Sequence, residues 1–143
     1  MKVQDIMSKE LAGSNAGDTV QHAAELMRQY DVGSVPVCSD GKLVGVVTDR
    51  DIAIRSAAGG QDPRRQKVAD IMSRVPVVGS SEMDVQNAAR MMSENQIRRL
   101  YIVDGGRLSG VLALGDISTA HTCESNAGET LKNISKPSRG AQA

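Results

Sequence analysis

The chain has 143 residues, of which 40% are hydrophobic, and it contains no Phe or Trp. Tyr30 and Tyr101 are the only aromatic side chains, so the core must consist of aliphatic residues and methionine, which excludes aromatic base-stacking platforms and aromatic cages. Seventeen Lys and Arg balance seventeen Asp and Glu, so we expect no nucleic-acid partner and no attraction to anionic membranes.

Cysteine usage and the length of the apolar runs indicate a cytoplasmic protein. Cys38 and Cys123 each lack a second cysteine nearby, which fits neither a disulfide framework nor a CxxC site, so both are predicted to be reduced. No apolar run approaches the roughly 18 residues of a membrane helix, and we expect no membrane association.

The chain contains an internal repeat. Residues 3–8 (VQDIMS) match residues 68–73 (VADIMS), and the same offset continues without a gap over about fifty residues. Further matching words are VQHAAELM at 20–27 with VQNAARMM at 85–92, and GKLVGV at 41–46 with GRLSGV at 106–111. One register over several words indicates a tandem duplication, and two copies predict a pseudo-two-fold pair that buries a shared face.

Each copy begins with a short strand and an amphipathic helix. Apolar residues recur at positions i, i+3, i+4 and i+7, the stripe of a helix that packs on one face. These residues are Val20, Ala23, Ala24 and Met27 in the first copy, and Val85, Ala88, Ala89 and Met92 in the second. Asp18–Thr19 and Asp84 precede the stripes and are predicted N-caps.

A hairpin and a second helix follow in each copy. Apolar runs at residues 35–38 and 100–103 end at the turn sequences SDG and DGG, and a second apolar strand follows each turn, at residues 43–47 and 108–112. The second helices start near Asp49 and Leu114, with Thr48 as N-cap in the first copy only. The sequence therefore predicts an α/β fold of two β-α-β-β-α units.

The predicted domain boundaries follow the repeat. We assign residues 1–60 to the first repeat, 61–67 to a linker and 68–122 to the second repeat. Residues 123–135 are predicted to form a C-terminal helix, and residues 136–143 a flexible tail.

The word GVVTDRD at residues 45–51 carries the strongest chemical pattern, at a junction between a strand and a helix. A helix N-terminus has free N–H groups and the positive end of the dipole, which suits a phosphate. Thr48 is placed to donate its hydroxyl to that phosphate, Arg50 to neutralise it, and Asp51 to accept hydrogen bonds from two ribose hydroxyls. The alternative is that Asp51 only complements the helix dipole.

Together these words resemble a CBS domain pair, the cystathionine-β-synthase-type tandem also called a Bateman module. The resemblance covers residues 1–121 and is closest to the small stand-alone bacterial CBS-pair proteins. The words that carry it lie at residues 3–7, 32–37, 45–52, 97–103 and 110–117.

The resemblance implies a regulatory module without a catalytic cofactor that binds AMP, ADP, ATP or S-adenosylmethionine in clefts between the copies. One cleft would use Thr48, Arg50 and Asp51, with the backbone around Pro76 and Val77 and the pair Arg98 and Arg99 from the other copy. The second would use Asp116, Met7, Ala12 and the segment Gly33, Ser34 and Val35. Ala113 replaces the Thr or Ser expected at the position of Thr48, so we expect the first cleft to be the better site.

Several of these residues also fit a structural role. Arg98 and Arg99 are equally compatible with a solvated pair at a helix end, and as neighbours at a strand entry they point in opposite directions. The methionines at 7, 27, 72, 91 and 92 are predicted mainly as core residues. His22 and His121 have no partner at metal-ligand spacing, and no metal site is predicted.

An energy or metabolite sensor is the function favoured by these residues. The alternative is a ligand-independent dimerisation or scaffold module for a partner protein. An enzyme is not expected, because the chain has no Ser-His-Asp or Cys-His set and no Walker GxxxxGK[ST] word. The resemblance further implies a homodimer that forms a flat disc of four repeats, with an unidentified effector protein that recognises the bound state.

Overall fold

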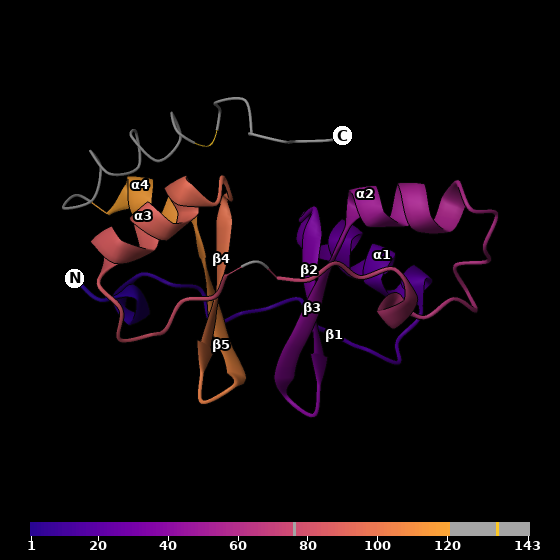
Figure 1. Ribbon diagram of the computed structural model, residues 1–143, viewed down its shortest axis with the longest axis horizontal. Helices are drawn as coiled ribbons and strands as arrows, with labels where there is room; N and C mark the ends of the chain where they lie inside the picture. Colours follow the sequence, from indigo (N-terminus) through magenta and orange to yellow (C-terminus); the bar gives the residue numbers. More distant parts are fainter. Residues whose placement is uncertain (76, 121–133, 135–143) are drawn as a thin grey trace. The chain divides into compact units, whose positions relative to one another are not determined.

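The computed structural model describes residues 1–75, 77–120 and 134. The predicted C-terminal helix and tail, with His121 and Cys123, lie outside the described residues apart from Ile134. Over the rest, helices and strands alternate in a mixed α/β fold, as the sequence predicts (Figure 1).

Both repeats contain the same main elements. The first repeat has η1 (Val3–Asp5), β1 (Ser14–Asn15), α1 (Val20–Tyr30), β2 (Ser34–Ser39), β3 (Lys42–Thr48), α2 (Asp49–Asp51) and the π-helical η2 (Ile52–Ala57). The second repeat has η3 (Val68–Asp70), α3 (Val85–Glu94), β4 (Arg99–Asp104), β5 (Arg107–Ala113) and α4 (Leu114–Thr119).

The first strand of each repeat is much shorter than the hairpin strands. β1 has two residues and pairs in parallel with β2 through Ser14 and Val37, whereas the corresponding pairing among the described residues of the second repeat is a single bridge between Gly79 and Ile102. β2 pairs antiparallel with β3, and β4 is the hydrogen-bonded neighbour of β5. The hairpins therefore carry most of the strand pairing.

Local sequence signals account for the ends of these elements. The Thr19 side chain accepts a hydrogen bond from the backbone N–H of His22, and Asp84 accepts one from Gln86, so both predicted N-caps are confirmed. The hairpin loops consist of two residues each, Asp40–Gly41 and Gly105–Gly106. All four have positive φ, between 53° and 81°, as a type I′ turn requires.

The molecule has two compact units, and each takes its first segment from the other repeat. The first-repeat unit comprises residues 11–75 with 106–108, and the second-repeat unit comprises residues 1–10, 77–105 and the described residues from 109 onward. The boundaries of these units differ from the predicted repeat boundaries. The repeat boundaries describe the duplication in the sequence, and they stay a prediction.

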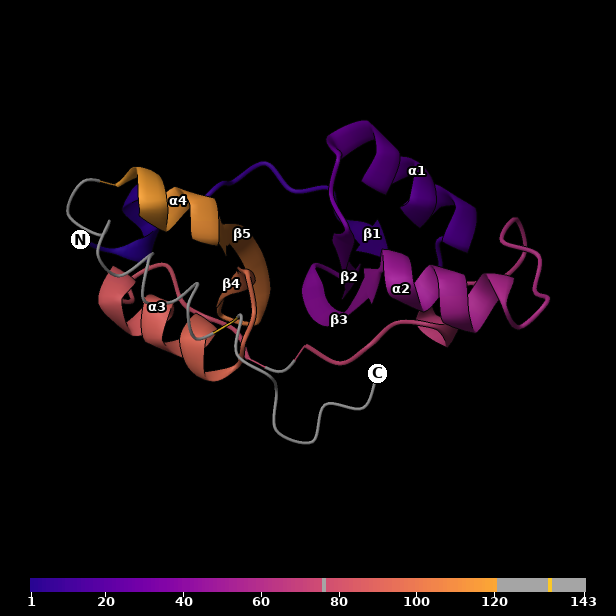
Figure 2. The ribbon, with the colours of Figure 1, turned by 90° about the horizontal axis from the view of Figure 1, so that it is seen from above.

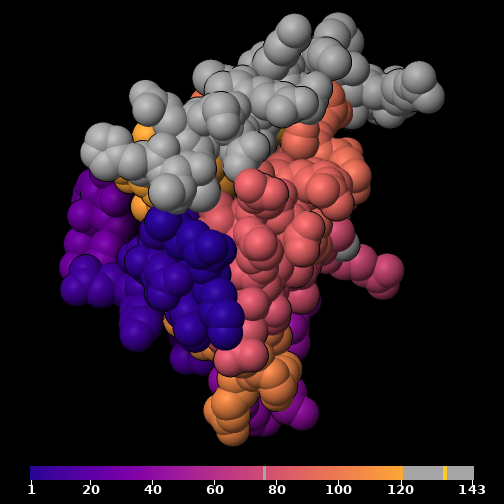
Figure 3. Space-filling view, turned by 90° about the vertical axis from the view of Figure 1, so that its left-hand side faces the viewer, coloured from indigo at the N-terminus to yellow at the C-terminus, as the bar shows by residue number. Residues whose placement is uncertain are grey.

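The exchange uses equivalent residues in both units. The N–H of Val3 donates to the carbonyl of Met83 at 2.8 Å, and the N–H of Val68 donates to the carbonyl of Asp18 at 2.9 Å. Figure 3 shows the N-terminal residues against the segment around residues 80–90. Val3 and Val68 are both fully buried, so each first segment completes the core of the unit that receives it.

The cores are aliphatic with methionine, as the composition predicts. α1 and α2 lie on the same side of the β1–β3 sheet, and α3 and α4 lie side by side on the β4–β5 hairpin (Figure 2). The stripe prediction was wrong at Ala24, which is exposed, whereas Ala89 of α3 is buried. The first core contains Val20, Ala23, Met27, Val35, Val37, Val47, Val68 and Ile71. The second contains Val3, Val85, Ala88, Ala89, Met92, Leu100, Ile102, Leu112 and Ile117.

Candidate functional site

The junction between β3 and α2 is held by a reciprocal cap. Thr48 Oγ1 accepts from the backbone N–H of Asp51 at 3.0 Å, and Asp51 Oδ2 accepts from the backbone N–H of Thr48 at 2.9 Å. This capping box confirms Thr48 as the N-cap and fixes both side chains. The Thr48 hydroxyl is an acceptor in this bond, so its own proton remains available to an acceptor on a ligand.

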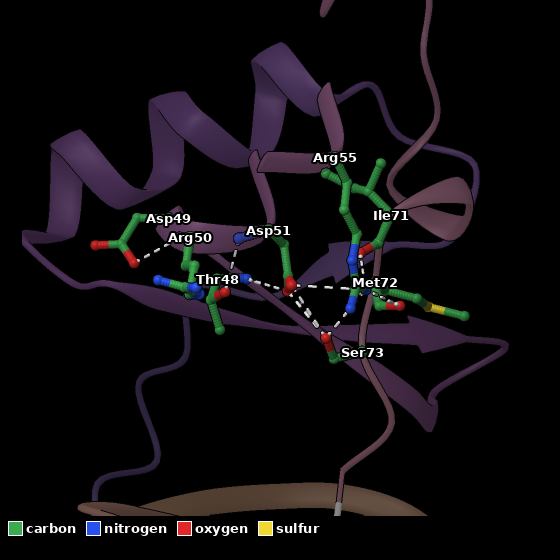
Figure 4. Close-up of polar contacts among 8 residues, drawn as sticks. All are labelled: Thr48, Asp49, Arg50, Asp51, Arg55, Ile71, Met72 and Ser73. Carbon is green, nitrogen blue, oxygen red and sulfur yellow. Dashed lines mark hydrogen bonds and ion pairs between the residues drawn. The ribbon is translucent and has the colours of Figure 1, made fainter. Parts of the chain in front are cut away.

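The carboxylate of Asp51 is enclosed by polar groups. Its side chain is only 9% exposed, and the Ser73 hydroxyl lies 3.1 Å from Oδ1 and 3.2 Å from Oδ2 (Figure 4). One guanidinium nitrogen of Arg55 lies 3.6 Å from Oδ1. Burial of a carboxylate requires such partners. Asp51 therefore has contacts beyond the cap, which itself engages only Oδ2.

The side chain of Arg55 connects η2 to the start of the second repeat through hydrogen bonds. The same guanidinium nitrogen donates to the carbonyl of Ile71 at 3.0 Å and to that of Met72 at 3.4 Å, and it lies 3.3 Å from Ser73 Oγ. Arg55 stands four residues after Asp51, one helical turn away, so both side chains reach the same segment. Arg55 and Ser73 are not among the residues predicted from the sequence, although Arg55 has helical spacing from Asp51 and Ser73 lies in the repeated word.

A glycine makes room for this segment. The backbone N–H of Val46 donates to the Ser73 carbonyl at 2.9 Å, and the Ser73 N–H returns a bond of 2.7 Å. A Cβ on Gly45 would lie 2.7 Å from Met72 Sδ and 3.0 Å from the Ser73 carbonyl oxygen. The exchanged segment therefore approaches the backbone at the start of the GVVTDRD word so closely that this position requires a glycine.

The equivalent junction in the second-repeat unit has fewer polar groups. Asp116 Oδ2 accepts from the backbone N–H of Ala113 at 2.8 Å, but Ala113 has no hydroxyl to complete the box. Ala120 occupies the place of Arg55 in the repeat. Ser8, the counterpart of Ser73, donates its hydroxyl to the carbonyl of Glu10 at 3.3 Å. The two units therefore share the same backbone arrangement at this junction but differ in its polar side chains.

The residues predicted for the first cleft divide between the units. Thr48, Arg50 and Asp51 are brought together in the first-repeat unit, where the exposed Arg50 side chain points away from Ser73 (Figure 4). Val77 belongs to the second-repeat unit and packs against its core, and Pro76 lies outside the described residues.

Arg98 and Arg99 belong to the second-repeat unit and differ in burial. Arg98 is exposed, whereas Arg99 is half-buried and begins β4. Within the described residues, the buried Nε of Arg99 has no hydrogen-bond partner. α3 already ends at Glu94, so the alternative of a solvated pair at a helix end was wrong.

The residues predicted for the second cleft also divide between the units. Asp116 and Met7 lie in the second-repeat unit, where Met7 packs against the core. Ala12 and residues 33–35 lie in the first-repeat unit. The Gly33 carbonyl accepts from the N–H of Asp49 at 2.9 Å, Ser34 is half-buried, and Val35 is a fully buried core residue. Both clefts stay predictions.

Asp104 and Cys38 lie outside this junction and also have shifted pKa values. The Ser109 hydroxyl, at 2.6 Å, and the Ser81 backbone N–H, at 3.0 Å, lower the pKa of Asp104. Burial raises the pKa of the Cys38 thiol. In the part of the chain that the structure describes, no three His, Cys, Asp or Glu side chains gather as metal ligands, and no helix is long and apolar enough to span a membrane.

Comparison with known proteins identifies the family. The family model for the CBS domain matches residues 3–57 and 68–121. The chain therefore belongs to the CBS domain family and carries two such domains in tandem, which confirms the resemblance found in the sequence.

Relatives and solved structures of this family are similar over most of their length. CBS domain-containing protein YhcV of Bacillus subtilis (strain 168) is 42% identical over 133 residues, which cover 93% of this chain and 94% of that protein. The crystal structure of Hypoxic Response Protein I with two coordinated zinc ions has a TM-score of 0.74 at 30% identity, over 82% of this chain and 97% of that one. The crystal structure of CBSX2 in complex with AMP has a TM-score of 0.68 at 30% identity, over 80% and 91%.

Proposed function

We propose that this chain is a regulatory module that binds an adenosyl ligand, AMP, ADP, ATP or S-adenosylmethionine, and acts as an energy or metabolite sensor. The observation that carries the proposal is the enclosed Asp51 carboxylate beside Thr48 at the junction of β3 and α2. The complex of CBSX2 with AMP, a CBS structure 30% identical to this chain, supports an adenine nucleotide as the ligand.

Each side chain at the junction has a distinct role in this proposal. Asp51 accepts hydrogen bonds from the ribose hydroxyls, as acidic residues do in other nucleotide sites. Thr48 keeps a hydroxyl proton that it donates to a phosphate oxygen. The exposed guanidinium of Arg50 neutralises phosphate charge.

The second-repeat unit completes the first cleft in this proposal. The backbone of residues 76–77 contacts the ligand, together with Arg98 or Arg99. The buried Nε of Arg99, which lacks an acceptor within the described residues, supports a role toward an anionic group.

The second cleft, built from Asp116, Met7, Ala12 and residues 33–35, is proposed as the weaker site. Ala113 supplies no hydroxyl, and Ala120 supplies no guanidinium where the first repeat has Arg55. We further propose that the chain forms a homodimer of four repeats, whose bound state is recognised by an effector protein.

Isothermal titration of the purified, nucleotide-stripped chain with AMP, ATP and S-adenosylmethionine tests the proposal. We expect saturable binding of at least one ligand, lost in Asp51→Ala and retained in the matched variant Asp116→Ala. Thermal unfolding of both variants verifies that they are folded. Absence of heat with all three ligands at millimolar concentration would refute the sensor and favour a ligand-independent scaffold.

A further inference from the structure

The Ser73 hydroxyl lies in front of both carboxylate oxygens of Asp51. A carboxylate has two oxygens with about four lone-pair positions. Oδ2 accepts from the backbone N–H of Thr48, and the Ser73 hydroxyl lies within 3.2 Å of both oxygens. The guanidinium of Arg55 lies 3.6 Å from Oδ1. The Ser73 hydroxyl is nearly equidistant from the two oxygens, the place from which a vicinal diol would donate one hydrogen bond to each of them, so the diol and this hydroxyl compete for the same position.

Ser73 is the partner that can move at the lowest cost. The Thr48 N–H belongs to the backbone and is fixed by the capping box. Arg55 is fixed by its bonds to the carbonyls of Ile71 and Met72. The Ser73 hydroxyl, in contrast, rotates about a single side-chain bond, while the two bonds to Val46 keep its backbone in place.

We propose that Ser73 is an intramolecular competitor of the ligand at Asp51. The ribose diol replaces the Ser73 hydroxyl on the carboxylate, so the affinity of the site is lowered by the hydrogen bond that Ser73 loses. This inference rests on the proposed function and concerns how tightly the ribose is held. Ser73 reaches Asp51 only because the first segment of the second repeat is exchanged into the first-repeat unit.

The second-repeat unit supplies a matched control. Ser8 is the counterpart of Ser73, and its backbone pairs with Val111 as that of Ser73 pairs with Val46. Its hydroxyl donates to the Glu10 carbonyl. Removal of the Ser8 hydroxyl therefore tests a serine at the same place in the fold that does not compete at Asp51.

The experiment compares AMP with 2′,3′-dideoxyAMP, which lacks both ribose hydroxyls, by titration of the wild-type chain, Ser73→Ala and Ser8→Ala. We expect Ser73→Ala to bind AMP about three- to tenfold more tightly than wild type, the equivalent of one net hydrogen bond. The affinity for dideoxyAMP is expected to be the same in both proteins, and Ser8→Ala is expected to match wild type with both ligands.

Each other result has a defined meaning. Equal or weaker binding of AMP by Ser73→Ala overturns the inference, and weaker binding makes Ser73 a ligand contact instead. An equal gain for dideoxyAMP also overturns it, because the gain would not depend on the diol. If the wild-type chain binds none of AMP, ATP and S-adenosylmethionine in a way that Asp51→Ala removes, the proposed function fails and the inference fails with it.

Discussion

The two repeats allow a helix cap to be removed in one copy and added in the other. Thr48 and Ala113 have nearly the same backbone conformation, with φ and ψ of −112° and 162° against −99° and 156°. In both, the following aspartate accepts from the cap residue's own N–H, at 2.9 and 2.8 Å. Thr48 has a methyl group and a hydroxyl that Ala113 lacks, and the hydroxyl accepts from the N–H of Asp51 at 3.0 Å.

The magnitude of the effect follows from that one bond. Loss of a Thr N-cap costs about 1 kcal/mol, within a range of about 0.5–2 kcal/mol. Thr48→Ala should lower the free energy of unfolding by about that amount, and Ala113→Thr should raise it by a similar amount. If the two caps act independently, the double variant should unfold at nearly the wild-type urea concentration.

Urea denaturation at neutral pH, monitored by circular dichroism, measures these differences as shifts of the midpoint at constant slope. Thr119→Ala is the control, because this exposed threonine in α4 donates to the carbonyl of Asp116 and caps nothing. The reasoning is refuted if Thr48→Ala is as stable as wild type, or if Ala113→Thr is less stable than wild type.

Three further predictions concern packing and ionisation. Gly45→Ala should cost about 1–3 kcal/mol in urea denaturation because of overpacking, whereas Gly13→Ala, with open space around the new Cβ, should not show this overpacking cost; equal losses would contradict this. The lowered pKa of Asp104 gives stability that is present above about pH 4 and lost as the pH falls through the folded-state pKa. The loss of unfolding free energy in Asp104→Asn relative to wild type should therefore be largest at pH 7 and shrink toward pH 3. A loss that is the same at both pH values would argue against ionisation as its cause. Because burial raises the pKa of Cys38, iodoacetamide should modify it more slowly than free cysteine in a Cys123→Ser background, with its pH profile displaced upward; an equal rate would show an unperturbed thiol.

The elements that the sequence predicted correctly depend on interactions between close neighbours in the chain. Thr19 and Asp84 cap helices through residues two or three positions later, and the loops after Ser39 and Asp104 need only residues that tolerate positive φ. The capping box of Thr48 with Asp51 likewise spans four residues. Such local interactions are recognisable from spacing and residue type alone.

The exchange of first segments was not predictable from this information. Val3 and Val68 carry the same apolar signal whether they pack in their own repeat or in the other, so spacing does not select the unit. The contact of Ser73 with Asp51 depends on that choice, and it was missed for this reason. The exposure of Ala24 was not predictable either, because a periodic stripe does not indicate how wide its packing partner is.

The difference between the two serines identifies what directs Ser73 to the carboxylate. Ser73 and Ser8 occupy equivalent positions and have equivalent backbone pairing, yet only the Ser73 hydroxyl donates to an aspartate. In the first-repeat unit the guanidinium of Arg55 donates to Ser73 Oγ, which leaves the hydroxyl proton to point at Asp51. Ala120 cannot do this for Ser8, whose proton goes to a backbone carbonyl instead. The Arg55 guanidinium, which has no counterpart at Ala120, thus distinguishes the surroundings of Ser73 from those of Ser8.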